Sequence, residues 1–129
     1  MAPTDALRNR LVRRESGFTL IELLIVLVII GVLLAIAVPS YLGFRDRADD
    51  SAAKANVRAA VPAVEAWYAD HSTYAGMDLT GLQAIDQGLR LDPLDAGKQT
   101  IDDYCIGATV GGKSWYKGGP ADDLSTTAC

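Results

Sequence analysis

Residues 18–38 read FTLIELLIVLVIIGVLLAIAV, and the organisation of the chain follows from this apolar run. As a helix the run is about 31 Å long, enough to cross a bilayer core of about 30 Å. Its one charged residue is Glu22, and a carboxylate inside lipid costs roughly 2.5–3.5 kcal/mol. No lysine or arginine lies between Phe18 and Tyr41 to neutralise it. Cleavage after Gly17 would supply a cation, because Phe18 would then carry a free ammonium four residues from Glu22.

The junction Gly17-Phe18-Thr19-Leu20-Ile21-Glu22 resembles the cleavage and methylation signal of type IV prepilins, as do the preceding arginines, the apolar run and Pro39. The resemblance implies that a prepilin peptidase removes residues 1–17 and methylates the new amino group of Phe18. It also implies that Glu22 is needed for assembly into a helical filament of identical subunits. The further partners it implies are an inner-membrane assembly platform and an assembly ATPase.

Charge is unevenly divided along the chain, whose net charge is −4. Residues 1–17 contain four arginines against two acidic residues, so the remaining chain is more acidic than the whole. Arginines that precede a membrane helix favour a cytoplasmic N-terminus, which puts the residues after Val38 outside. An acidic mature chain also argues against general nucleic-acid binding, which depends on neutralising phosphates.

A helical pattern continues beyond the apolar run. Apolar residues recur every three or four positions and mark one helix face: Ala53, Val57, Ala60, Val61, Val64, Trp67 and Tyr68. We therefore predict one helix over residues 18–70, with residues 18–38 suited to a membrane or filament core and residues 39–70 forming an amphipathic external half. Pro39 and Pro62 each remove an amide donor from this helix and are predicted to kink it.

Residues 71–129 are predicted to form a small head on the apolar face of the helix. Thr80-Gly81-Leu82-Gln83 fits a capping box that would start a short helix. Alternating patterns predict strands near 88–92, 103–110, 114–117 and 124–129, with a tight hairpin at Gly111-Gly112. The fold class is therefore α+β: a long N-terminal helix packed on a small antiparallel sheet of three or four strands, as in pilins.

Cys105 and Cys129 both lie in the part of the chain predicted to be external. An even cysteine count in an exported chain favours a disulfide, and only one pairing is available. Closing a loop of this size is worth roughly 3–4 kcal/mol in the chain-entropy model. That contribution is large for a head of about 60 residues, whose core alone gives marginal stability.

The sequence offers no constellation for catalysis, a metal or a cofactor. His71 is the only histidine, and no nucleophile, base and orienting acid can be assembled without it. The pairs Asp102-Asp103 and Asp122-Asp123 are interpreted as solvated turn residues rather than calcium ligands. Arg45, Arg47, Lys54 and Arg58 are interleaved with Asp46, Asp49 and Asp50, which indicates a mixed solvated or subunit-contacting face.

Two alternatives remain open. The chain could be a pseudopilin of a type II secretion or DNA-uptake system, although the cysteine pair favours a pilus subunit. It could also be a secreted soluble binding domain, because Ala35-Ile36-Ala37 fits a signal-peptide cleavage site after Ala37. The favoured prediction is a non-enzymatic structural subunit that enters the cytoplasmic membrane with its N-terminus inside. Its mature form would then work in an extracellular pilus.

Overall fold

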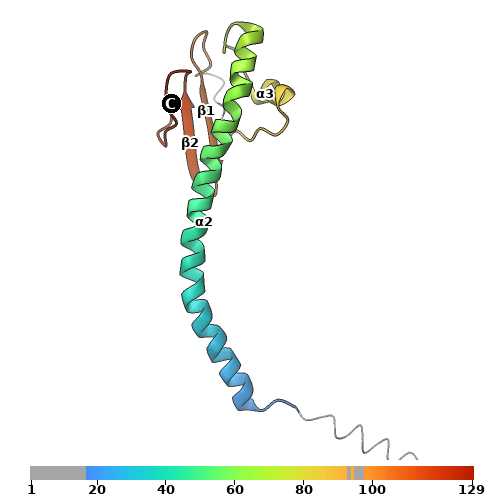
Figure 1. The fold of residues 1–129 in the computed structure, drawn as a ribbon, viewed down its shortest axis with the longest axis vertical. Helices are drawn as coiled ribbons and strands as arrows, with labels where there is room; N and C mark the ends of the chain where they lie inside the picture. Colours follow the sequence, from blue (N-terminus) through green and yellow to red (C-terminus); the bar gives the residue numbers. More distant parts are fainter. Residues whose placement is uncertain (1–16, 93, 95–97) are drawn as a thin grey trace, which may run out of the picture. The chain divides into compact units, whose positions relative to one another are not determined.

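The computed structural model describes residues 17–92, 94 and 98–129, and its elements follow the predicted order. Helix α2 spans Leu20–His71, helix α3 spans Leu79–Ile85, and strands β1 and β2 span Cys105–Val110 and Lys113–Gly118 (Figure 1). The chain forms two compact units that divide between Tyr41 and Leu42, within α2. The predicted α+β class is confirmed: the later part of the long helix packs on a small antiparallel sheet. The predicted leader, residues 1–17, lies outside the described residues except for Gly17.

Helix α2 begins at Leu20 because Thr19 and Glu22 cap it. The Thr19 amide donates to Oε2 of Glu22 at 2.9 Å, and the Glu22 amide donates to Oγ1 of Thr19 at 3.3 Å. This reciprocal pair is a capping box, which satisfies two amide groups that a helix start otherwise leaves unpaired. The helix therefore starts two residues after the predicted start at Phe18. The Thr-x-x-Glu spacing was visible in the sequence, where we had assigned Glu22 a role in assembly only.

The first unit exposes its apolar side chains. No part of the most apolar 18-residue window of α2 is buried, and the mean hydropathy of that window is 3.2. By length and composition α2 can cross a membrane. The exposed side chains include Leu20, Leu27, Leu33 and Ile36, each more than half accessible. An apolar surface of this extent requires lipid or other protein to cover it.

Both prolines lie within α2, which is helical from Leu20 to His71. A proline at position 39 cannot donate to the carbonyl of Ala35. The hydroxyl of Ser40 donates to the neighbouring carbonyl of Ile36 at 3.3 Å. The kinks at Pro39 and Pro62 stay predictions.

The second unit is built on one face of the later part of α2. Its buried helix residues are small or β-branched and recur at helical spacing: Ala53, Val57, Ala60, Ala63 and Val64. They pack against side chains from the rest of the unit: Tyr74, Met77, Leu82, Leu89, Leu91, Tyr104, Ile106 and Ala108. Small residues on α2 let the sheet and loops approach the helix closely. The resulting core fixes the head to this part of the helix.

The sheet is a single hairpin. Strands β1 and β2 pair antiparallel, with Cys105 opposite Gly118 and Val110 opposite Lys113. Gly111 and Gly112 form the turn with φ of 54° and 80°, which is the geometry of a type I′ turn. The predicted hairpin is confirmed, and both strand predictions near it are correct to within two residues at each end.

The outer two strand predictions were wrong, because local hydrogen bonds divert the backbone there. At residues 88–92 the amides of Gly88 and Leu89 turn back to Asp86, and only Asp92 donates to β1, at Gly107. At residues 124–129 Ser125 forms one isolated bridge with Tyr116. The Thr127 amide then bonds to Oγ of Ser125 at 3.0 Å, a local turn that competes with the sheet ladder. The sheet in the described residues therefore has two strands.

Helix α3 begins earlier than predicted. Asp78 is its N-cap, and Oδ1 of Asp78 accepts a hydrogen bond from the Gly81 amide at 2.7 Å. The predicted capping box at Thr80 was wrong, because aspartate two residues upstream makes the stronger, charge-assisted cap. The Asp86 amide donates to the carbonyl of Leu82 and ends the helix two residues before Gly88.

Replacing Gly81 with alanine should destabilise the head, although alanine is the better helix former by about 1 kcal/mol. A Cβ at this position would overlap Cζ3 of Trp67, so the ring or α3 must move, at an expected net cost of about 1–2 kcal/mol. Thermal unfolding of the detergent-solubilised protein, followed by tryptophan fluorescence, measures the change. The matched control is Gly43→Ala, whose Cβ meets nothing within 4 Å and which should not lower the melting temperature. Equal melting temperatures for Gly81→Ala and the unmodified protein would contradict this packing.

Candidate processing and assembly site

The N-terminal junction is open on all sides. Gly17, Phe18 and Thr19 precede α2 outside any helix or strand, and the side chain of Phe18 is 84% exposed. A Cβ at Gly17 would meet nothing within 4 Å, so packing does not explain a glycine there. An accessible segment without secondary structure is suited to entering the cleft of a protease.

The capping box directs Glu22 toward this junction. Because Oε2 of Glu22 accepts from the Thr19 amide at 2.9 Å, the carboxylate lies next to the backbone of the residue that follows Phe18. If the chain is cut after Gly17, the Phe18 ammonium becomes the nearest new cation. The described structure thus joins Glu22 to Thr19. The roles of Gly17 and Phe18 in cleavage and of Glu22 in assembly stay predictions.

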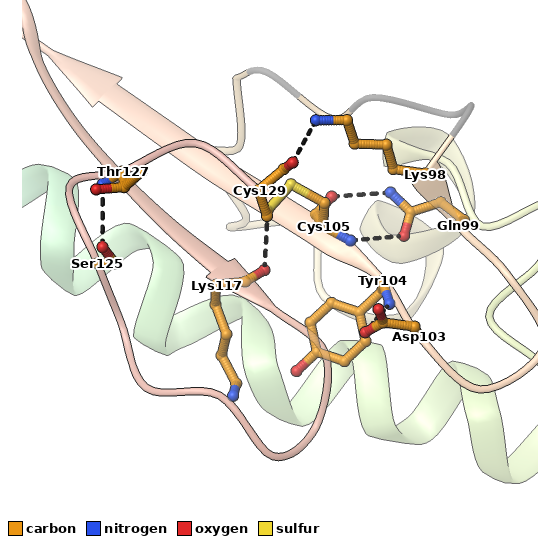
Figure 2. The surroundings of a disulfide bond; sticks show 9 residues. All are labelled: Lys98, Gln99, Asp103, Tyr104, Cys105, Lys117, Ser125, Thr127 and Cys129. Carbon is orange, nitrogen blue, oxygen red and sulfur yellow. Dashed lines mark hydrogen bonds between the residues drawn. A yellow bond between two sulfur atoms is a disulfide. The ribbon is translucent and has the colours of Figure 1, made fainter.

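The disulfide joins Cys105, the first residue of β1, to Cys129, with a Cα–Cα distance of 5.9 Å. Figure 2 shows its surroundings. The Gln99 side chain clamps the backbone of Cys105: Nε2 donates to its carbonyl at 2.8 Å, and its amide donates to Oε1 at 3.2 Å. Lys98 Nζ donates to the carbonyl of Cys129. The predicted pairing is confirmed, whereas no pattern in the sequence indicates the contacts of Gln99 with Cys105.

A buried aromatic cluster lies beside the disulfide. The Tyr74 hydroxyl donates to the carboxylate of Glu65 at 3.3 Å, and its ring meets the ring of Tyr104 edge-on at 4.8 Å between centroids. Burial, with the nearby charge of Glu65, raises the pKa of Tyr74 to about 12. The same causes raise the pKa of Tyr104 further. Lys117 Nζ lies 6.0 Å from the centroid of the Tyr104 ring, so the cluster fixes the end of β2 against α2.

The remaining polar groups form no catalytic set in the part of the chain that the structure describes. There, no group of three or more histidine, cysteine, aspartate or glutamate residues could hold a metal ion. His71 stacks on Trp67 with ring centroids 3.9 Å apart, and its Nδ1 is 3.0 Å from the carbonyl of Trp67. A groove of about 230 Å³ between α2, α3 and β1 is lined by Asn56, Leu79, Gln83, Leu89, Arg90, Leu91, Asp92 and Thr109. Its charged groups, Arg90 and Asp92, form no acid–base pair with a nucleophile.

These features define a class of protein before any comparison is made. A helix with an uncovered apolar half, an accessible junction beside Glu22 and a small disulfide-closed head together describe a membrane-anchored, pilin-like subunit.

Comparison with known proteins identifies the family. A family model described as the prokaryotic N-terminal methylation motif matches residues 12–38. The chain is 36% identical over 115 residues to the type IV wide pilus major component PilA4 of Thermus thermophilus, covering 84% of each protein. It is 44% identical over 62 residues to the type IV major pilin protein PilA of Myxococcus xanthus, covering 48% of this chain and 28% of that protein. It belongs to the type IV pilin family.

The chain is also similar to a secretion-system protein. The chain is 37% identical over 73 residues to the type II secretion system core protein G of Vibrio cholerae, covering 57% of this chain and 49% of that protein. Thus the alignment extends over most of PilA4 but only about half of core protein G or less than a third of PilA. No solved structure gives a significant match.

Removing the disulfide should destabilise the head by about 3–4 kcal/mol, because residues 119–129 are otherwise held by one bridge and a few polar contacts. The variant is Cys105→Ser combined with Cys129→Ser, and the measurement is the urea midpoint of the full chain in detergent. Reductant should lower the midpoint of the unmodified protein by a similar amount and leave that of the double variant unchanged. A double variant as stable as the oxidised protein would contradict a stabilising role.

Proposed function

We propose that this chain is the structural subunit of a type IV pilus-like filament and that it is processed between Gly17 and Phe18. The observation that carries the proposal is the exposed apolar half of α2, which begins at a junction matching the N-terminal methylation motif. In this proposal residues 1–17 are a leader, residues 18–38 cross the membrane and later form the filament core, residues 39–70 are the external part of the helix, and residues 71–129 are the head.

Assembly is proposed to depend on the charge of Glu22. Before cleavage its carboxylate is held by the Thr19 amide within the same chain. After cleavage the methylated ammonium of Phe18 becomes available, and a subunit docking beside another pairs one subunit's Glu22 with its neighbour's Phe18. A buried carboxylate without a partner is strongly unfavourable in an apolar core, so only an arrangement in the correct axial register is stable.

The proposed partners follow the same scheme. A prepilin peptidase removes the leader and methylates Phe18, while the leader arginines keep the N-terminus cytoplasmic. An inner-membrane platform and an assembly ATPase extract the subunit from the membrane.

Gly31 leaves open space on α2, since a Cβ there would meet nothing within 4 Å, and Ala35 lies one turn later. This pair of small residues lets a neighbouring helix approach closely in the filament core.

Two other functions differ in what they predict. The similarity to a type II secretion core protein supports a pseudopilin, which would be processed in the same way but work within a secretion system. The similarity over most of PilA4 and the Cys105–Cys129 disulfide favour a pilus subunit. A secreted soluble domain would begin at Val38, within the continuous helix α2.

The mass of the mature protein tests the processing. We expect loss of residues 1–17 and gain of one methyl group. Gly17→Leu should retain the leader, whereas Gly31→Ala should be processed normally. Neither glycine is required by packing in the described structure, so only recognition by a peptidase predicts this difference. A mature chain that begins at Met1 or at Val38 would rule the proposal out, and surface filaments containing the chain would favour the pilus over the secretion system.

Glu22→Leu should give a processed, membrane-held subunit that forms at least about tenfold fewer filaments, because it loses the charge that pairs with Phe18. The amount of the chain in the sheared filament fraction, relative to the membrane fraction, measures this. Thr19→Ala is the matched control: it removes the hydroxyl side of the cap, worth about 1 kcal/mol, but keeps the carboxylate. Normal filaments from Glu22→Leu, or an equal loss from Thr19→Ala, would show that pairing with Phe18 is not the cause.

A further inference from the structure

The charges on the external part of α2 are divided into paired and unpaired groups. The three aspartates nearest the hairpin turn each have a partner: Asp46 lies 4.0 Å from Lys113, Asp49 lies 4.0 Å from Arg45, and Asp50 accepts from Nε1 of Trp115 at 2.9 Å. Lys54 also has a partner, since its Nζ lies 4.4 Å from the centroid of the Trp115 ring. The contacts of Lys113 and Trp115 fasten the hairpin to the helix, and two arginines of the helix are left without a partner in the described residues.

Arg47 and Arg58 are those arginines. Both are exposed, and within the described residues neither makes a hydrogen bond or an ion pair. They are 11 residues apart, which is close to three full turns, so they lie on the same side of α2 about 16 Å apart along its axis. We call this the Arg47/Arg58 face. Of the interleaved aspartates, Asp46 and Asp49 each lie beside a cation, Lys113 and Arg45, whereas Asp50 keeps its charge because its partner is the neutral indole of Trp115. Arg47, Arg58 and Lys54 outnumber it, so this part of the helix stays net positive.

Acidic residues gather at another place on the head. Asp102 and Asp103 precede β1, Asp122 and Asp123 follow β2, and all four are exposed. They meet around the end of β2: a Cβ at Gly119 would overlap Oδ1 of Asp103, and a Cβ at Gly118 would lie 3.4 Å from Oδ2 of Asp122. We call these four residues the acidic end.

The lysines beside the acidic end are turned to backbone carbonyls. Lys117 is buried and its Nζ donates to the carbonyl of Asp122, while Lys98 Nζ donates to the carbonyl of Cys129. Asp102 and Asp123 make no hydrogen bond or ion pair within the described residues. The acidic end therefore keeps unpaired carboxylates that a cation from elsewhere could approach.

The two charged surfaces lie at different levels along the head. The hairpin turn packs near Asp49 and Trp115 bonds to Asp50, so the turn is at the level of Arg47. The opposite end of the hairpin is joined to the far part of α2, because the ring of Tyr104 meets that of Tyr74 edge-on and the Tyr74 hydroxyl donates to Glu65. Glu65 is about 27 Å along the helix from Arg47. A positive surface toward one end and a negative surface at the other suit a head-to-tail contact.

We infer that the Arg47/Arg58 face of one subunit docks on the acidic end of a second copy of this chain. The inference rests on the proposed filament and names the surface through which neighbouring heads recognise each other. Two different surfaces of the same molecule meet, so the contact does not close on itself and generates an open helical array. Two arginines on an acidic chain do not fit nucleic acid, whose binding draws on many neutralised phosphates.

Charge swapping in the full-length chain tests this contact. Arg47→Glu with Arg58→Glu should lower the sheared filament fraction at least about tenfold, because attraction becomes repulsion between subunits. Asp102→Lys with Asp123→Lys should do the same. Combining all four substitutions restores opposite charges and should bring filament yield back to within about threefold of the unmodified chain. Arg90→Glu, at an exposed arginine beside α3, is the matched control and should assemble normally.

Each result bears on a different claim. If the unmodified chain forms no filaments, the proposed function fails. If it does, normal assembly by either double variant, or a fourfold variant no better than the doubles, overturns the contact. Membrane levels and the Cys105–Cys129 disulfide, measured on non-reducing gels, establish that each variant folds.

A second measurement requires no variant. Raising salt from about 0.15 M to about 1 M shortens the screening length from about 8 Å to about 3 Å and should promote separation of wild-type filaments into subunits. Filaments equally stable at both salt concentrations would also overturn the contact.

Discussion

The apolar side chains of residues 20–38 have no cover within the described chain, and the rest of the molecule depends on that constraint. Lipid can cover them in a subunit, and other copies of the same helix can cover them in a filament. Both environments exclude water, so the single carboxylate of Glu22 carries a penalty in either one. The capping box with Thr19 gives this carboxylate a hydrogen-bond donor within its own chain and so reduces that penalty without adding a charge.

The later part of the same helix supplies one side of the core of the head. A small head has limited core, so it packs its hairpin on a stripe of alanine and valine along α2 and closes its last segment with a disulfide. Asp46 and Asp50 then fasten the hairpin through Lys113 and Trp115. One helix thus serves as anchor in its first part and as half of a core in its second, which explains its 52 residues.

The sequence allowed prediction of features that leave a distinct residue pattern. It did not show which of several competing hydrogen bonds the backbone would form locally. The helix, the hairpin turn at Gly111-Gly112 and the cysteine pair each leave a strong pattern. The strand expected at 88–92 shows the limit: Leu89 and Leu91 are buried alternately, as predicted, yet Asp86 captures the amides that a ladder would need. The Asp78 cap was missed for a similar reason, because two capping patterns overlap in the sequence. At the junction the bond between Thr19 and Glu22 was missed, because the Thr-x-x-Glu spacing lies within a motif that was interpreted for assembly alone.

The proposed assembly uses charges in two environments, the apolar filament core and the hydrated surface of the head. Because charges interact differently in the two, Glu22 and the two arginines are proposed to have different roles. In the proposed filament Glu22 lies where water is excluded, so its proposed pairing with Phe18 would be strong, little affected by salt and sensitive to axial position. Arg47 and Arg58 lie in water, where each exposed pair is worth little and salt weakens it further. Such weak contacts cannot hold a filament alone, but repeated in every subunit they can select the rotation at which heads meet. Register along the axis would then come from the apolar core, and orientation about it from the surface of the head.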